Sequence, residues 1–148
     1  DGKLLWSKNY EKDFGAKWFG GNAPGSGGTA ASRHGNNGAP VTDDKYIYAP
    51  VGSHLGASLV CLEKQTGKVV WKARPEGVKD TFYGSPVCAG GVIFCVSAYG
   101  KVVAIADGEE FRQLAVNDLD EICHSTPALA NGNLYLRLFE RLVCIKGT

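Results

Sequence analysis

Short apolar runs alternate with turn-forming residues along most of the chain. Three of the runs begin at a proline, and in each a short apolar piece meets a turn rich in Gly, Asn or Asp before a second apolar piece follows. The three prolines are Pro40, Pro86 and Pro127. Because Gly, Asn and Asp tolerate the positive φ that tight turns require, each run predicts a β-hairpin. No segment keeps the spacing of a sustained helix, so the pattern predicts an all-β fold.

Each hairpin is followed by a further β-rich run. These third runs lie at residues 58–63, 101–106 and 141–146. A fourth strand is expected after a Gly-containing turn at 68–74 and at 110–116, and the third copy has its counterpart at the other end of the chain, at 3–9. Four short antiparallel strands in units of about 40 to 45 residues are typical of the blades of a β-propeller.

The predicted organisation is a single domain, residues 1–148, of about three blades. Its parts are a lone fourth strand at 1–10, a long Gly-rich connection at 11–39, blades at 40–77 and 84–117, and a three-stranded blade at 125–148. Three blades do not close into a ring, because propellers have at least four. Each end of such an arc exposes an apolar face, which usually marks an interface.

Two distant segments share one motif. From Cys61 the chain reads Cys-Leu-Glu-Lys-Gln-Thr-Gly-Lys-Val-Val-Trp, and Cys144-Ile-Lys-Gly-Thr followed by Asp1-Gly-Lys-Leu-Leu-Trp has the same spacing when the two ends are joined. The pattern small-x-acidic-x-x-Thr-Gly-Lys-x-x-Trp resembles the tryptophan-docking motif of PQQ-like repeats. These repeats form the propeller blades of quinoprotein dehydrogenases and of outer-membrane assembly lipoproteins. The resemblance extends over nearly the whole chain apart from residues 11–37.

The resemblance implies structural roles for the motif residues. A tryptophan on an outer strand is expected to lie flat against the glycine and the small residue of an adjacent blade. The residues expected in this docking are Trp6, Gly67, Trp71, Cys61, Ala104 and Cys144. The copies of the motif that begin at Ala104 and Cys144 lack the acid found at Glu63. Phe111 is expected near the position of the second tryptophan, so weaker docking is expected at the blade that contains it.

The strand order gathers the candidate ligand-binding residues on one rim. If each blade starts at the central channel and moves outward, the fourth-to-first and the second-to-third connections share a rim, and loops on a rigid scaffold commonly carry binding residues. The candidates are Trp18, Phe19, Arg33, His34, Asn36, Asn37, His54 and His124. The connection 11–39 either lines a ligand surface there or only covers the joint between blades.

Metal-ligating residue types also occur on this rim. The candidates for a metal site are His34, His54, Cys123 and His124, and the alternative is a histidine that is merely hydrogen-bonded at the channel entrance. The five cysteines contain no Cys-x-x-Cys pair of the zinc or redox type, so they are interpreted as buried free thiols.

Composition excludes two classes of partner. Lys and Arg total 16 against 15 Asp and Glu, and the basic residues are scattered, so the chain lacks the electrostatic footprint of a nucleic-acid-binding protein. No apolar stretch approaches the roughly 20 residues that span a bilayer. We therefore expect neither a nucleic-acid partner nor a membrane span.

These observations favour a non-enzymatic β-propeller scaffold or binding module that uses its loop-rich rim to bind a protein or small ligand, without a cofactor. By resemblance, an active quinoprotein would supply adjacent cysteines, acidic and amide ligands for calcium, and a catalytic aspartate. The sequence has no Cys-Cys pair, and no residue can be matched to those roles. The alternative is part of a PQQ- and calcium-dependent alcohol or sugar dehydrogenase whose cofactor residues lie outside this chain. The resemblance points to an extracytoplasmic location, periplasmic or secreted.

The end faces of the arc predict a further partner. Two copies that exchange strands head to tail would form a six-bladed ring, in which residues 3–9 of each chain complete the last blade of the other. The alternatives are an excerpt of a longer propeller, whose remaining blades cover these faces, and an open or otherwise assembled form.

Overall fold

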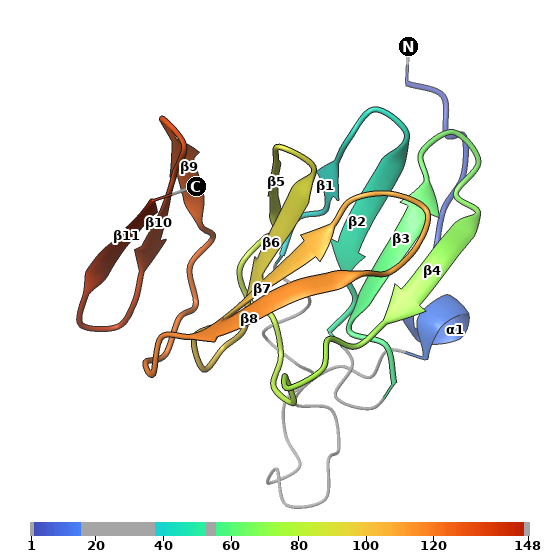
Figure 1. Ribbon diagram of the computed structural model, residues 1–148. Helices are drawn as coiled ribbons and strands as arrows, with labels where there is room; N and C mark the ends of the chain where they lie inside the picture. The colour runs from blue at the N-terminus through green and yellow to red at the C-terminus, as the bar shows by residue number, and fades with distance from the viewer. Residues whose placement is uncertain (1, 16–37, 53–55, 147–148) are drawn as a thin grey trace, which may run out of the picture.

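A computed structural model describes residues 2–15, 38–52 and 56–146 of the chain. Within these residues the chain forms three antiparallel sheets, which Figure 1 shows side by side as successive blades. Blade 1 comprises β1 (Val41–Thr42), β2 (Tyr46–Pro50), β3 (Leu59–Glu63) and β4 (Val69–Ala73). Blade 2 comprises β5 (Val87–Ala89), β6 (Val92–Val96), β7 (Lys101–Ala106) and β8 (Gln113–Asp118). Blade 3 comprises β9 (Ala128–Ala130), β10 (Asn133–Arg137) and β11 (Leu142–Lys146).

Neighbouring strands in each sheet follow the chain order, so every blade is a meander from β1, β5 or β9 outward. The first strands adjoin one another, β1 beside β5 and β5 beside β9, which places them on the inner side of the arc. The predicted all-β architecture of propeller blades is confirmed. The local reason is the turn chemistry: Gly90 and Gly91, and Asn131 with Gly132, adopt the positive φ that the hairpins require.

Close backbone contacts join the inner ends of the blades. A Cβ atom at Gly84 would lie 2.4 Å from the carbonyl oxygen of Ser125 in the next blade. A Cβ atom at Gly38 would lie 3.0 Å from the carbonyl oxygen of Gly84 and 2.8 Å from Cγ of Pro50. Glycine is therefore favoured at both positions, because the next blade crowds Gly84 and because Pro50 of blade 1 and the backbone of Gly84 crowd Gly38.

Apolar side chains fill the spaces between the blades. Between blades 1 and 2, Tyr48 and Cys61 pack against Ile93 and Ile105. Between blades 2 and 3 the buried residues are Val96, Val102, Cys123, Leu134, Leu136 and Leu138. Consecutive residues of β3 and β7 are buried because both faces of these strands are covered, as the uninterrupted apolar runs in the sequence indicate.

The N-terminal segment covers the remaining face of blade 1. Residues 2–9 are not part of any strand or helix, and they lead into α1 (Tyr10–Phe14), a helix of one turn. The Asn9 side chain caps α1 by accepting a hydrogen bond from the backbone N–H of Lys12. Phe14 is buried against Val60 and Leu62 of β3, so this segment occupies the side of blade 1 away from blade 2. The expected strand at 3–9 thus has no strand partner among the described residues.

Candidate functional site

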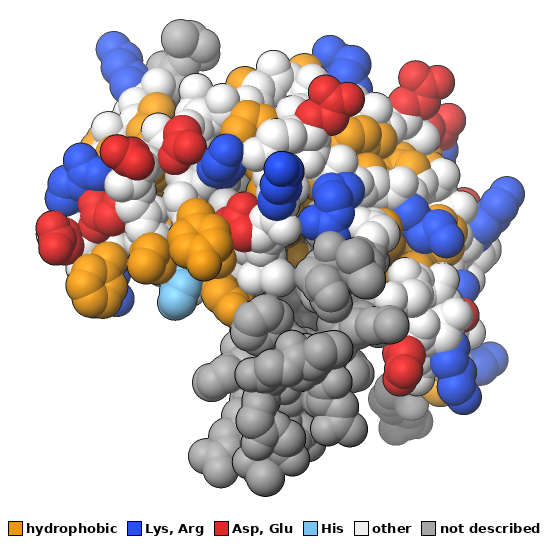
Figure 2. Space-filling model, turned by 90° about the horizontal axis from the view of Figure 1, so that it is seen from below, with side chains coloured by type: hydrophobic (Ala, Val, Ile, Leu, Met, Phe, Trp, Pro, Cys, Tyr) orange, Lys and Arg blue, Asp and Glu red, His pale blue; other side chains and the backbone are white. Residues whose placement is uncertain are grey.

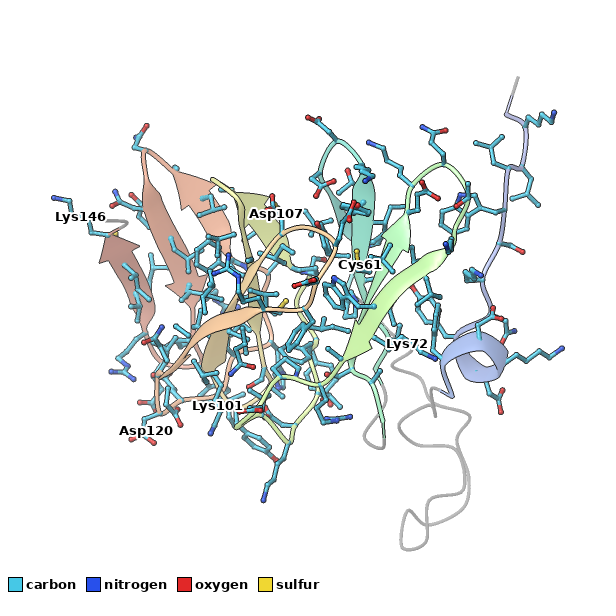
Figure 3. All side chains as sticks on the ribbon, turned by 45° about the vertical axis from the view of Figure 1, so that its right-hand side comes forward. Cys61, Lys72, Lys101, Asp107, Asp120 and Lys146 are labelled. Atoms are coloured by element: carbon cyan, nitrogen blue, oxygen red, sulfur yellow. The ribbon has the colours of Figure 1, made fainter. Side chains whose placement is uncertain are left out.

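The loop connections lie together on one rim of the arc, which we call the loop rim. It carries the connections before each first strand and those between second and third strands, and it is the lower side in Figure 1. The opposite side, with the hairpin turns and the turns between third and fourth strands, is the turn rim. Figure 3 shows Lys101 and Asp120 near the loop rim and Asp107 near the turn rim.

Of the rim residues expected from the sequence, His124 is described. It is exposed on the connection between blades 2 and 3, and its ring lies edge-on to that of Tyr83, with 4.8 Å between the centroids. The remaining candidates fall outside the described residues. They are Trp18, Phe19, Arg33, His34, Asn36, Asn37 and His54.

Of the metal candidates, Cys123 and His124 lie among the described residues, and His34 and His54 lie outside them. Cys123 is buried, and its thiol is 3.4 Å from the backbone carbonyl oxygen of Arg137, whereas the imidazole of His124 packs on Tyr83. Among the residues that the structure describes, no three His, Cys, Asp or Glu side chains gather as a metal site would require. A site that includes His34 or His54 stays a prediction.

Beside His124 the loop rim contains a pocket of about 400 Å³. Its lining residues are Ile122, His124, Ser125, Arg137, Leu138 and Phe139. Figure 2 looks onto this rim and shows hydrophobic side chains gathered beside the pale-blue histidine. Phe139 is 80% exposed and Ile122 is 43% exposed, so this pocket presents apolar surface to solvent.

Hydrogen bonds fix the loops that form the pocket. The backbone N–H of Phe139 donates to the carbonyl oxygen of Ile122, at 3.0 Å. The Glu121 carboxylate accepts hydrogen bonds from the backbone N–H of Glu140 and from the Arg141 guanidinium, whose Nε lies 2.6 Å from Oε2. These contacts hold the two connections together across the rim.

The joint between blades 1 and 2 repeats this construction. The backbone N–H of Tyr99 donates to the Asp80 carboxylate, at 2.8 Å, as that of Glu140 does to Glu121. A second pocket, of about 490 Å³, adjoins this contact. It is lined by Gly77, Lys79, Asp80, Tyr99 and Lys101. Asp80 precedes Pro86 by the same number of residues as Glu121 precedes Pro127. This repeated acid was a sequence signal for the contact between connections on the loop rim, and sequence reasoning missed it.

The two motif tryptophans contact the neighbouring blade. Trp6 Nε1 donates to the Lys64 carbonyl oxygen at 3.0 Å, and its ring lies so close to Gly67 that a Cβ there would be 2.6 Å from Cδ2. Trp71 on β4 donates from Nε1 to the Gly108 carbonyl oxygen of blade 2 at 3.1 Å. Residues 3–9 therefore lie against blade 1 much as β4 lies against blade 2.

The position of Phe111 differs from the expectation. Ala104 pairs with Ala115 in the register in which Cys61 pairs with Trp71, so Ala115 stands where a second tryptophan would fall. Phe111 belongs instead to the preceding turn, and its ring centroid lies 5.3 Å from that of Trp71. The turn of blade 2 is longer by one residue, and this shift is invisible in the spacing of the apolar runs.

The turn rim between blades 1 and 2 holds a polar network. The Tyr48 hydroxyl donates to the Asp43 carboxylate at 2.6 Å and accepts from the backbone N–H of Gly108 at 2.8 Å. Partial burial acts to raise the pKa of Asp43. The hydrogen bonds from Tyr48 and from the backbone N–H groups of Tyr46 and Lys45 outweigh it, so the pKa is lowered overall.

The cysteines of the chain are free thiols. Cys61, Cys95 and Cys123 are buried, whereas Cys144 on β11 is exposed. Burial, with a contribution from the charge of Asp43, raises the pKa of Cys61 to about 12, and burial raises that of Cys95 to about 12. Both thiols are therefore protonated at neutral pH and act as small apolar residues.

Comparison with known proteins agrees with the fold. A family model described as outer membrane protein assembly factor BamB matches residues 1–146. Among solved structures, the crystal structure of BamB from Moraxella catarrhalis is similar over 74% of the chain, with a TM-score of 0.51 and 17% sequence identity. The match covers 43% of that protein, so the chain spans less than half of this relative. No curated protein matches the chain significantly. No helix in the described part of the chain is both long and apolar enough to cross a bilayer.

Proposed function

The chain belongs to the family of the outer membrane protein assembly factor BamB, and from this premise we propose that it is a non-enzymatic β-propeller module that binds a protein through its loop rim. One observation carries the choice of rim. Among the described connections between strands, three residues have large apolar side chains that are exposed, and all three lie on the loop rim. They are Tyr99, Ile122 and Phe139. Exposed apolar groups that gather on one face mark interaction sites.

The proposal is tested by site-specific photocrosslinking in the cells that produce the protein. A photoreactive amino acid at Phe139 or Tyr99 should form adducts with another protein, whereas one at Asn131 on the turn rim should not. Asn131 is a suitable control because it is equally part of an exposed connection. Equal adduct formation from both rims, or from neither, would contradict binding through the loop rim.

We propose an extracytoplasmic location, periplasmic or secreted, on the strength of the family. The description of the matching family refers to assembly at the outer membrane. Fractionation of the producing cells would test the location, and recovery of the protein with cytoplasmic markers would count against it.

We further propose that the module works without PQQ or calcium. None of the comparisons supports the alternative of a dehydrogenase fragment, since the family and the similar structure are both described as BamB. Purified protein mixed with PQQ and calcium should leave the absorption spectrum of free PQQ unchanged and should not reduce a dye in the presence of alcohols or sugars. Cofactor-dependent dye reduction would overturn this part of the proposal.

The end faces of the arc are proposed to be covered by a second copy or by the rest of a longer propeller. Residues 3–9 occupy the place of an outer strand before blade 1, yet no inner strands accompany them in the described residues. At the other end, Leu142 of β11 is 75% exposed and Cys144 is exposed. A three-stranded blade such as blade 3 would supply the strands that residues 3–9 lack.

A further inference from the structure

The pocket between blades 2 and 3 combines an apolar wall with a single charged group. Ile122, Leu138 and Phe139 form the apolar part, and Arg137 is the charged side chain of the lining. No carboxylate lines the pocket. Glu121, an acid of the same joint, is engaged by Arg141 and by the backbone N–H of Glu140.

The Arg137 side chain has no ion pair or hydrogen bond within the described part of the chain. Its backbone is nevertheless well fixed, because its carbonyl oxygen accepts a hydrogen bond from the Ser125 hydroxyl at 2.7 Å. A guanidinium presents several N–H donors in a planar fork that matches the two oxygens of a carboxylate. The pocket thus offers a cationic donor group on a rigid base.

Contacts within the chain fix two of the pocket residues. Phe139 is tied to Ile122 through its backbone N–H, and His124 is packed edge-on against Tyr83. A surface that is already ordered loses little conformational entropy on binding. The exposed ring of Phe139 is therefore available as an apolar anchor.

The openness of the site favours a polypeptide over a small molecule. Small-molecule pockets usually bury most of the ligand, whereas His124, Arg137 and Phe139 are all exposed. The second pocket, beside Tyr99, lies at the equivalent joint of the previous blades. An extended segment of a partner protein can continue along the rim from one joint toward the next, which a small molecule cannot do.

We propose that the pocket formed by Ile122, Arg137 and Phe139 binds a segment of a partner protein in which a carboxylate side chain neighbours a large apolar side chain. The carboxylate pairs with the Arg137 guanidinium, and the apolar side chain packs against Phe139 and Ile122. This inference rests on the proposed function, because it names the chemistry of the partner that the loop rim binds.

The test is an NMR titration of the isotope-labelled full chain with blocked peptides. The probe is acetyl-Gly-Asp-Phe-Gly-amide. The ligands used for comparison are the analogue with Asn-Phe, the analogue with Asp-Ala, and acetate. We expect shifts in the backbone amides of His124, Phe139 and Glu140 with the Asp-Phe peptide. Its affinity should exceed that of the Asn-Phe peptide by roughly three- to tenfold, as for an ion pair with an exposed guanidinium.

Matched variants assign the two contacts. Arg137→Gln should remove the preference for Asp over Asn, and Phe139→Ala should weaken both peptides about equally. The controls are Arg112→Gln, an exposed arginine outside the pocket, and Leu114→Ala, an exposed leucine on β8; neither should change the titration.

Several outcomes would overturn the proposal. These are equal affinity for the Asp-Phe and Asn-Phe peptides, an unchanged preference in Arg137→Gln, and shifts by acetate equal to those by the peptide. Shifts confined to other loop-rim amides, such as that of Tyr99, would overturn this pocket and leave binding through the loop rim standing. Shifts on neither joint of the loop rim would count against both.

Discussion

At the scale of single residues, the contact between Trp6 and Gly67 shows how sequence position and packing act together. Gly67 has a φ of 68°, which other residues adopt only with strain, and its missing side chain leaves room for the Trp6 ring. Gly132 has a similar φ of 72°, but a Cβ atom at this position would have no neighbour within 4 Å. Alanine substitutions at the two glycines therefore distinguish the cost of the left-handed backbone conformation from the cost of steric contact with Trp6.

Gly67→Ala should destabilise the fold more than Gly132→Ala does. Both variants place alanine in the left-handed region, at a cost of about 1 to 2 kcal/mol, and Gly67→Ala should add about 1 to 3 kcal/mol for overpacking against Trp6. Urea unfolding measures both free energies. In a Trp6→Ala background the two substitutions should cost the same; a persistent difference there would show that the ring contact is not the cause.

The Tyr48 hydroxyl links blade 1 to blade 2 by accepting from Gly108, and its other hydrogen bond, to Asp43 of its own blade, depends on pH. The pKa of Asp43 is lower in the folded state than its ordinary value of 3.8, so the stabilisation is complete above that pH and is lost as the pH falls through the folded pKa. Tyr48→Phe should lower the free energy of unfolding by about 1 to 2 kcal/mol at pH 6. The difference between the two proteins should shrink below pH 3.8. Thermal unfolding followed by circular dichroism across this range is the measurement, and a difference that does not vary with pH would contradict the assignment.

At the scale of elements, a repeated hydrogen bond from a backbone N–H to a side-chain hydroxyl joins the inner ends of the blades. The backbone N–H of Ala39 donates to the Ser85 hydroxyl at 2.8 Å, and that of Ser85 donates to the Thr126 hydroxyl at 2.9 Å. Each donor and acceptor directly precedes the first proline of its blade. The same sequence position thus links each blade to the next.

Gly84→Ala should loosen the joint between blades 2 and 3. Its Cβ would meet the Ser125 carbonyl oxygen at 2.4 Å, and a backbone atom cannot rotate away as a flexible side chain can. We expect a loss of about 1 to 3 kcal/mol, the usual range for overpacking. Gly2→Ala is the control, since nothing lies within 4 Å of its Cβ. Equal unfolding free energies for the two variants would contradict the predicted steric cost at Gly84.

At the scale of the whole molecule, the arc has two different end faces. One face of blade 1 is covered by Trp6, Tyr10 and Phe14 of the N-terminal segment. On the outer side of blade 3, Leu142 and Cys144 are exposed within the described part of the chain. Figure 1 shows β11 on the opposite side of the molecule from the N-terminal segment. Figure 3 likewise shows Lys146, at the end of β11, far from the N-terminal strand position. In the described residues, β11 accordingly pairs with β10 and not with residues 3–9 of its own chain.

If a second copy covers these faces, the chain should have about twice its 15.7 kDa mass in solution. Light scattering after size-exclusion chromatography measures this mass. Removal of residues 1–9 should return the protein to the monomer mass, because the exchanged segment with exposed Leu4 and Leu5 is lost. A stable monomer whose unfolding is unaffected by that removal would contradict strand exchange, and it would leave the longer propeller and the open or otherwise assembled form as the remaining arrangements.

The sequence alone determined the blade as the repeating unit. Hairpin turns, apolar strands and the Trp-containing motif are local patterns, because a turn or a strand depends mainly on residues near it in the chain. The blade strands, the all-β class and the family follow from such patterns. Strand order also predicts on which rim each loop lies, and His124 lies in the connection between blades 2 and 3.

Only the tertiary structure decided which residues meet across blades. It moved Phe111 from the expected tryptophan position into a turn, and it brought Arg137 and Phe139 beside Ile122. These contacts join residues far apart in the chain, and they depend on loop lengths and on how closely the blades approach. No periodicity records such distances, because packing between blades is set by volume and backbone position rather than by local preference.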